Sequence, residues 1–147
     1  MTMADMTDPM FLMDAASSNM LEIQLGKMAA QQATHPEVKK FGQMMQDHHT
    51  KATQELKTVA SQLKVQMPTT LMPVHQELVD KVQGKSGAEF DEAYMDAMET
   101  AHRLDIAKFE MKSNSAENAT VKAFAAKTLP MLQSHMKMAK ELEDKVD

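Results

Sequence analysis

Apolar residues recur at steps of three and four positions along most of this chain, which is the spacing of one face of an α-helix. The pattern predicts four long helices, at about residues 9–33, 36–65, 86–112 and 119–146. The second of these helices shows the spacing clearly, with an apolar stripe of Val38, Phe41, Met45, Leu56 and Val59. No segment shows the alternation of a β-strand, so we expect an all-α protein.

The predicted helix starts carry recognisable signals. Asp8 and His35 are the predicted N-cap residues of the first two helices, and each precedes a proline, whose missing N–H costs nothing in the first turn of a helix. Ser86 begins a capping box, and Asn118 is a favourable N-cap residue. Pro130 falls within the last predicted helix on the side opposite its apolar face, where we expect a kink rather than a break.

Residues 66–85 separate the second and third long helices. They contain Pro68, Pro73 and Gly84 around a short amphipathic stretch at 74–82, which predicts a long connection with one short helix. The chain also aligns with itself, with Leu21-Glu22-Ile23 on Leu104-Asp105-Ile106 and with Val38-Lys39 and Phe41 on Val121-Lys122 and Phe124.

Two similar helical hairpins joined by a long connection form the plan of a ferritin-like up-down four-helix bundle, with a long crossover that contains a short helix. We expect one bundle domain over residues 9–147. A methionine-rich segment, residues 1–8, precedes it and is expected to be flexible.

Composition excludes several classes of function. The net charge of −5 and the aromatic content of 4% disfavour nucleic acid as a partner, and no apolar stretch is long enough to span a membrane. The first basic residue is Lys27, so no charged secretory leader is visible. The absence of cysteine removes disulfides and thiolate metal sites, and no nucleophile elbow or Gly-rich phosphate loop indicates an enzyme.

Ionisable side chains interrupt the predicted apolar faces near the middle of the bundle. Glu22 and Asp105 lie within the faces of the first and third helices, and His135 lies within that of the fourth. His48 and His49 flank the stripe of the second helix, while His102 lies beside Phe109. Such groups either satisfy one another by hydrogen bonding or bind a metal ion, and the sequence leaves both interpretations open.

The methionines indicate which metal such a site would take. The chain has 17 Met, and the pattern Met-x-x-x-His recurs on the predicted helices, as Met44/His48, Met45/His49, Met98/His102 and Met131/His135. Thioether and imidazole one helical turn apart suit copper, especially Cu(I). Iron is disfavoured, because di-iron bundles use Glu-x-x-His on two helices, and only Glu99 and His102 match that pattern here.

The chain also resembles a family, the domain of unknown function 4142 proteins. The resemblance rests on Leu21–Ala29, Pro36–Phe41 with Asp47-His48, Gly87–Tyr94, and Lys122–Pro130 with His135. It implies a bacterial, ferritin-like bundle with an extracytoplasmic, usually periplasmic, location, and it brings no activity. The positions that the resemblance marks as recurring are Glu22, His48, His102 and His135.

Two functions therefore remain. In the first, the protein binds copper through core residues, for metal tolerance or delivery, with the candidate ligands His48, His102, His135, Met45, Met98, Met131, Glu22, Asp105 and His49. In the second, it is a non-catalytic structural or protein-interaction module of the cell envelope that binds no metal.

Overall fold

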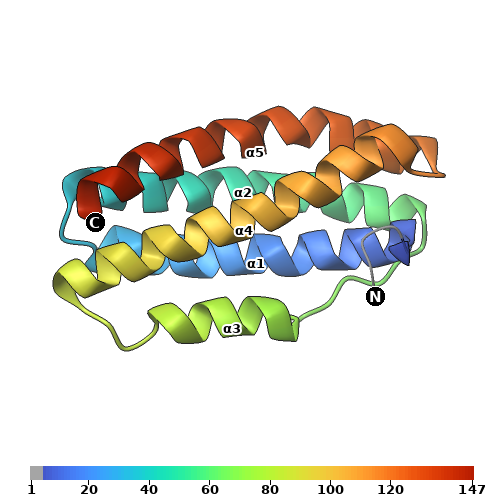
Figure 1. Ribbon diagram of the computed structural model, residues 1–147. Coiled ribbons are helices and arrows are strands. Elements are labelled where there is room, and N and C mark those ends of the chain that lie inside the picture. The colour runs from blue at the N-terminus through green and yellow to red at the C-terminus, as the bar shows by residue number, and fades with distance from the viewer. Residues whose placement is uncertain (1–4) are drawn as a thin grey trace.

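The computed structural model describes residues 5–147, which form five helices. These are α1 (Asp8–Gln32), α2 (Pro36–Gln62), α3 (Pro73–Val82), α4 (Gly87–Ser115) and α5 (Ala119–Val146). Helix α1 packs along α2, and α4 along α5, so the bundle consists of two hairpins (Figure 1). The prediction of an all-α bundle is confirmed. Helices α2 and α4 run in the same direction, which is why a crossover must return along the length of the bundle (Figure 1).

The helix ends differ from the predicted ones by a few residues. Helix α2 stops at Gln62 rather than near residue 65, because Lys64 adopts a left-handed backbone conformation with a φ of 58°. Helix α4 continues to Ser115, and the hydroxyls of Ser113 and Ser115 donate hydrogen bonds to carbonyl groups of the preceding turn. Helix α5 continues through Pro130, whose side chain is exposed.

One predicted N-cap residue is wrong, one predicted capping box does not form, and two side-chain caps are confirmed. The N-cap of α1 is Thr7 rather than Asp8, because the Thr7 hydroxyl accepts a hydrogen bond from the Met10 N–H at 3.2 Å. Ser86 is the N-cap of α4 but makes no side-chain bond, so the predicted capping box does not form. His35 and Asn118 each cap their helix through a side-chain acceptor, as their place in the sequence predicts.

The internal repeat of the sequence appears as a pair of reciprocal contacts between the hairpins. Asp8 accepts a hydrogen bond from the Asn118 N–H at the α4–α5 turn, at 2.8 Å. Asp91 accepts one from the His35 N–H at the α1–α2 turn, also at 2.8 Å. These residues are equivalent in the self-alignment, Asp8 with Asp91 and His35 with Asn118. An aspartate near the start of each hairpin therefore binds the turn of the other hairpin.

The segment at 1–8, predicted to be flexible, lies partly outside the described residues, since residues 1–4 are not among them. Within the described part, the Lys112 ammonium donates to the Met6 carbonyl at 2.7 Å and pairs with Asp8 at 2.8 Å. The side chain of Met6 also packs against the apolar core. Residues 6–8 are thus attached to the bundle.

The crossover is fastened to α1 by a buried hydroxyl. The Ser17 hydroxyl accepts a hydrogen bond from the Met72 N–H at 2.8 Å and lies 2.6 Å from Nδ1 of His75, the third residue of α3. Both Ser17 and His75 are buried. This contact holds α3 beside α1 and α4, where it covers one side of the bundle (Figure 1).

Two apolar clusters fill the bundle, one toward each end. The first includes Phe41, Tyr94 and Leu142, and the second includes Phe11 and Phe124. Between them, at mid-height, lies a layer of buried polar side chains from α1, α2, α4 and α5. These are Ser18, Asn19, Glu22, His49, His102, Asp105 and His135.

Two glycines bring α1 and α2 into close contact. A Cβ atom added at Gly26 would lie 2.6 Å from the carbonyl oxygen of Gly42, and one added at Gly42 would lie 2.7 Å from Cβ of Ala29. Neither helix can therefore carry a larger residue at the crossing without moving backbone. Because Glu22 lies one turn before Gly26, this contact also fixes the distance between Glu22 and α2.

Replacing Gly26 by Ala should lower the free energy of unfolding by about 1–3 kcal/mol, because the added methyl group overlaps backbone. Helix propensity alone would raise it by about 1 kcal/mol, so the sign of the change separates the two effects. The control is Gln24→Ala, at an exposed position of the same helix, with an expected change below about 0.5 kcal/mol. Urea unfolding followed by circular dichroism measures both, and a Gly26→Ala protein as stable as the parent would contradict the close contact.

Candidate functional site

Three buried histidines meet in the polar layer, each from a different helix. His49 belongs to α2, His102 to α4 and His135 to α5, and each is at most 1% exposed. One ring nitrogen of each lies within 4.8 Å of the other two. The ring centroid of His135 lies 5.4 Å from the centroid of His49 and 5.4 Å from that of His102. Three imidazole nitrogens therefore face one small volume.

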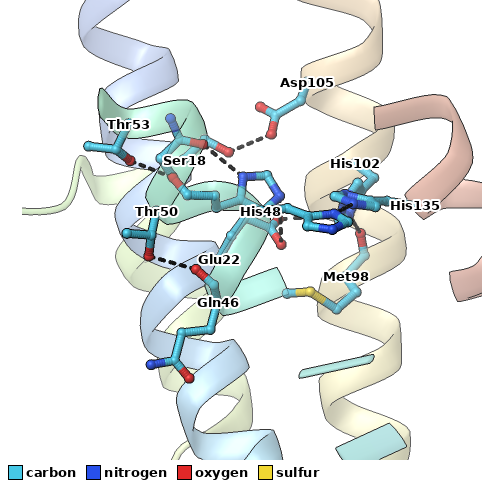
Figure 2. Close-up of polar contacts among 12 residues, drawn as sticks. Ser18, Glu22, Gln46, His48, Thr50, Thr53, Met98, His102, Asp105 and His135 are labelled. Atoms are coloured by element: carbon cyan, nitrogen blue, oxygen red, sulfur yellow. Dashed lines mark hydrogen bonds and ion pairs between the residues drawn. The ribbon is translucent and has the colours of Figure 1, made fainter. Parts of the chain in front are cut away.

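A fourth histidine extends this cluster to the surface. His48 is exposed, yet its Nδ1 lies 2.8 Å from Nε2 of His135, and the two rings stack at a centroid distance of 5.0 Å. Figure 2 shows the side chains of His48, His102 and His135 close together, and the contacts place His135 between the other two. His48 thus connects the buried cluster to solvent.

The hydrogen bonds fix which nitrogens carry protons when the rings are neutral. The Met98 carbonyl can only accept, so His102 donates to it from Nδ1, at 2.8 Å, and keeps a lone pair on Nε2. His135 then donates from Nδ1 to that lone pair at 3.4 Å, and His48 donates from Nδ1 to Nε2 of His135. The result is a directed chain of imidazoles from the surface to the centre.

The same reasoning places the proton of the His49 ring. Its Nδ1 lies 2.7 Å from the side-chain oxygen of Asn19, which can only accept, so Nδ1 carries the proton. The lone pair then lies on Nε2, which has no hydrogen-bond partner among the described residues. This nitrogen faces the carboxylate of Glu22, at 3.8 Å.

Glu22 from α1 completes the site. Its side chain is fully buried, with one oxygen 3.7 Å from Nδ1 of His102 and the other 3.8 Å from Nε2 of His49. Both distances exceed hydrogen-bond length, and neither oxygen has a partner within residues 5–147. Because burial penalises the anion, the pKa of Glu22 rises to about 8.

Burial acts on the histidines in the opposite sense. It lowers the pKa of His135 to about 3, with a further contribution from repulsion by His102 and His48. Burial likewise lowers the pKa of His102, and it holds the pKa of His49 well below the ordinary value. At neutral pH the three rings are therefore uncharged, which is the protonation state that binds a metal ion.

The remaining predicted residues take different positions. Asp105 is buried and accepts a hydrogen bond from the Ser18 hydroxyl at 2.5 Å, and burial raises its pKa to about 7 (Figure 2). Met45 and Met98 are fully buried in the apolar cluster next to the histidines. Met131 is half-buried and lines a surface hollow together with His48.

Two residues of the layer were not predicted from the sequence. Ser18 holds Asp105 and Asn19 holds His49, so both orient an ionisable side chain. Asn19 lies three residues before Glu22 and shares its helix face, which is a signal that the sequence offers. Ser18 offers no comparable signal, since serine is common on buried and exposed faces alike.

Comparison with known proteins agrees with this description of a helical bundle. The chain matches the family described as "Domain of unknown function (DUF4142)" over residues 1–142, and it belongs to that family. A comparison with curated protein sequences gives no significant match.

Solved structures with a similar fold include CopM. The Cu(II)-bound and Cu(I)-bound forms of CopM each give a TM-score of 0.77 at 20% identity, covering 95% of this chain and 97% and 96% of theirs. The Ag-bound form gives 0.74 at 19% identity, covering 95% of this chain and 96% of that one. At this level of identity the similarity establishes a shared fold.

No described helix of the bundle has both the length and the apolar character needed to cross a membrane.

Replacing Glu22 by Gln should stabilise the metal-free protein, and increasingly so as the pH rises. The folded protein keeps a proton on Glu22 up to about pH 8, whereas the unfolded chain releases it near 4.5. The parent therefore loses stability as the pH rises through this interval, by up to about 1.4 kcal/mol per pH unit, and the variant does not.

Urea unfolding at pH 5 and pH 8, with a chelator present, measures this difference. Other titrating groups are common to both proteins, so their effects cancel in the comparison. The control is Glu77→Gln, at an exposed position of α3. A stability gap between Glu22→Gln and parent that stays constant from pH 5 to pH 8 would contradict the raised pKa.

Proposed function

We propose that this protein binds copper at the mid-bundle centre, with His49, His102 and His135 as its ligands. The observation that carries the proposal is the meeting of three buried, neutral imidazoles, with nitrogens within 4.8 Å of one another. Beside them lies the carboxyl group of Glu22, for which residues 5–147 provide no hydrogen-bond partner. Buried polar groups are normally satisfied, and a cation at this point would satisfy them together.

Charge favours a cation in this volume. An ion beside Glu22 stabilises the ionised carboxylate, so binding supplies the positive charge that the neutral imidazoles lack. A monovalent ion such as Cu(I) and the ionised carboxylate of Glu22 together carry no net charge, which minimises the cost of burying them. The proton held by Glu22 in the metal-free protein is released when the ion binds.

The neighbouring side chains favour copper over harder metals. Imidazole accepts zinc, copper, iron and nickel, but thioether selects Cu(I). Met45 and Met98 are fully buried, and each precedes a ligand histidine by four residues, which is one helical turn on the same face. Figure 2 shows Met98 on the turn of α4 before His102. Asp105, held by Ser18, and the more distant Met131 have no place in this first set of ligands.

The similarity to CopM supports the proposal, because a chain of the same fold has been solved with Cu(II), Cu(I) and Ag. We place the protein in the periplasm, as the family resemblance implies, where it would serve copper tolerance or delivery. A site enclosed by four helices shields Cu(I) from solvent, and such a buried site suits a role in copper sequestration.

The test is a Cu(I) competition titration against a coloured chelator, on protein purified without a histidine tag. The parent should bind copper tightly, and the His102→Ala, His135→Ala double variant should bind it at least about a hundredfold more weakly, because it loses two of three ligands. Copper should also raise the melting temperature of the parent and not that of the double variant.

The matched control is His35→Asn, which removes an imidazole at the α1–α2 turn and preserves the helix cap. It should bind copper as the parent does. Circular dichroism establishes that the variants keep their helices. Equal binding by the double variant would place the site elsewhere, including the methionines near the N-terminus (Met1, Met3, Met6, Met10, Met13), of which Met1 and Met3 lie outside the described residues. A parent that binds no copper would leave the envelope module as the function.

A further inference from the structure

A hollow of about 150 Å³ opens on the surface between α2 and α5, directly outside the candidate centre. His48, Glu55, Thr128 and Met131 are among the residues that line it. Since helices α2 and α5 belong to different hairpins, the hollow lies on a seam between the hairpins and not within one.

His48 lines this hollow, and its ring contacts the ring of the buried His135. The rings stack with an interplanar angle of 18°, and 2.8 Å separates Nδ1 of His48 from Nε2 of His135. The other nitrogen of His135 faces His102, at 3.4 Å. His135 therefore has one nitrogen directed to the outside and one directed to the centre.

We propose that the hollow at His48 and Met131 is the access site through which copper reaches the buried centre, with His48 passing the ion to His135. This inference rests on the proposed function and adds to it a route and an outer binding site. His48 and Met131 offer an imidazole and a thioether, the pair of donors that suits Cu(I).

The geometry explains why His48 is an access residue and not a permanent ligand. Two imidazole nitrogens that bind the same ion lie about 3.3–4 Å apart, at about 2 Å per metal–nitrogen bond. The facing nitrogens of His102 and His135, at 3.4 Å, meet this requirement, whereas those of His48 and His135 are in hydrogen-bond contact at 2.8 Å. His48 is exposed, so its ring can swing outward into the hollow, but His135 is held within the core. When the ring of His48 returns, it closes the centre behind the ion.

Proton positions remain balanced during the transfer. In the metal-free chain His135 carries its proton on Nδ1, the nitrogen that faces His102. Binding of the ion at that nitrogen requires the proton to move to Nε2, which can then donate to Nδ1 of His48. His48 in turn carries its own proton on Nε2, toward solvent. Only the two tautomers change, and neither ring loses its proton.

The test measures rates in both directions, with Cu(I) presented as its complex with a coloured anionic chelator. Stopped-flow absorbance follows transfer to the protein, and excess chelator added to the loaded protein follows release. Replacing His48 by Ala should slow uptake and release at least tenfold each, because both use the same route, while the affinity changes less than about tenfold. Met131→Leu, which keeps the apolar volume, should slow both to a smaller extent.

The control is again His35→Asn, which should exchange copper at the parental rates. A His48→Ala protein that exchanges copper as fast as the parent would overturn the route. One that releases copper faster, with correspondingly weaker binding, would make His48 an ordinary ligand and would also overturn it. A parent that takes up no copper at equilibrium would instead disprove the proposed function, so the two failures are distinguishable.

Discussion

The carboxyl group of Glu22 lies at the centre of the bundle without a hydrogen-bond partner among the described residues, and the rest of the structure accommodates the cost of burying it. Around it stand imidazoles that burial keeps neutral, so these neighbouring rings supply no positive charge to compensate. A buried ionisable group of this kind is destabilising unless something else satisfies it. The apolar clusters above and below the layer, together with the close α1–α2 crossing, provide the stability that allows the centre to exist.

The frame of the bundle is symmetric and its centre is not. Asp8 and Asp91 occupy equivalent places in the two repeats, and each binds the turn of the opposite hairpin. Glu22 and Asp105 are also equivalent in sequence, but Ser18 satisfies Asp105 whereas Glu22 is left facing the histidines. The repeat thus preserves the contacts that hold the hairpins together, while the middle of each helix has taken a different chemical role.

The neighbouring residues His48 and His49 illustrate how one helix serves two environments. Successive residues of a helix point about 100° apart, so His49 faces the core, where it meets Asn19 and Glu22, and His48 faces the seam with α5. The layer is therefore continuous from the surface to the interior. One dipeptide therefore contributes a residue to the buried cluster and a residue to its connection with solvent.

The four long helices, the short helix of the crossover and the presence of Glu22, His102 and His135 in the core can be read from the sequence, because they follow from apolar periodicity. The hairpin repeat follows from the alignment of the chain with itself. The sequence did not decide which of His48 and His49 points inward, or that Ser18 would hold Asp105 apart from the histidines. Those outcomes depend on how far each helix is rotated about its axis and on which partners it then meets. That rotation is set by tertiary contacts, such as Gly26 against Gly42, which no local pattern encodes.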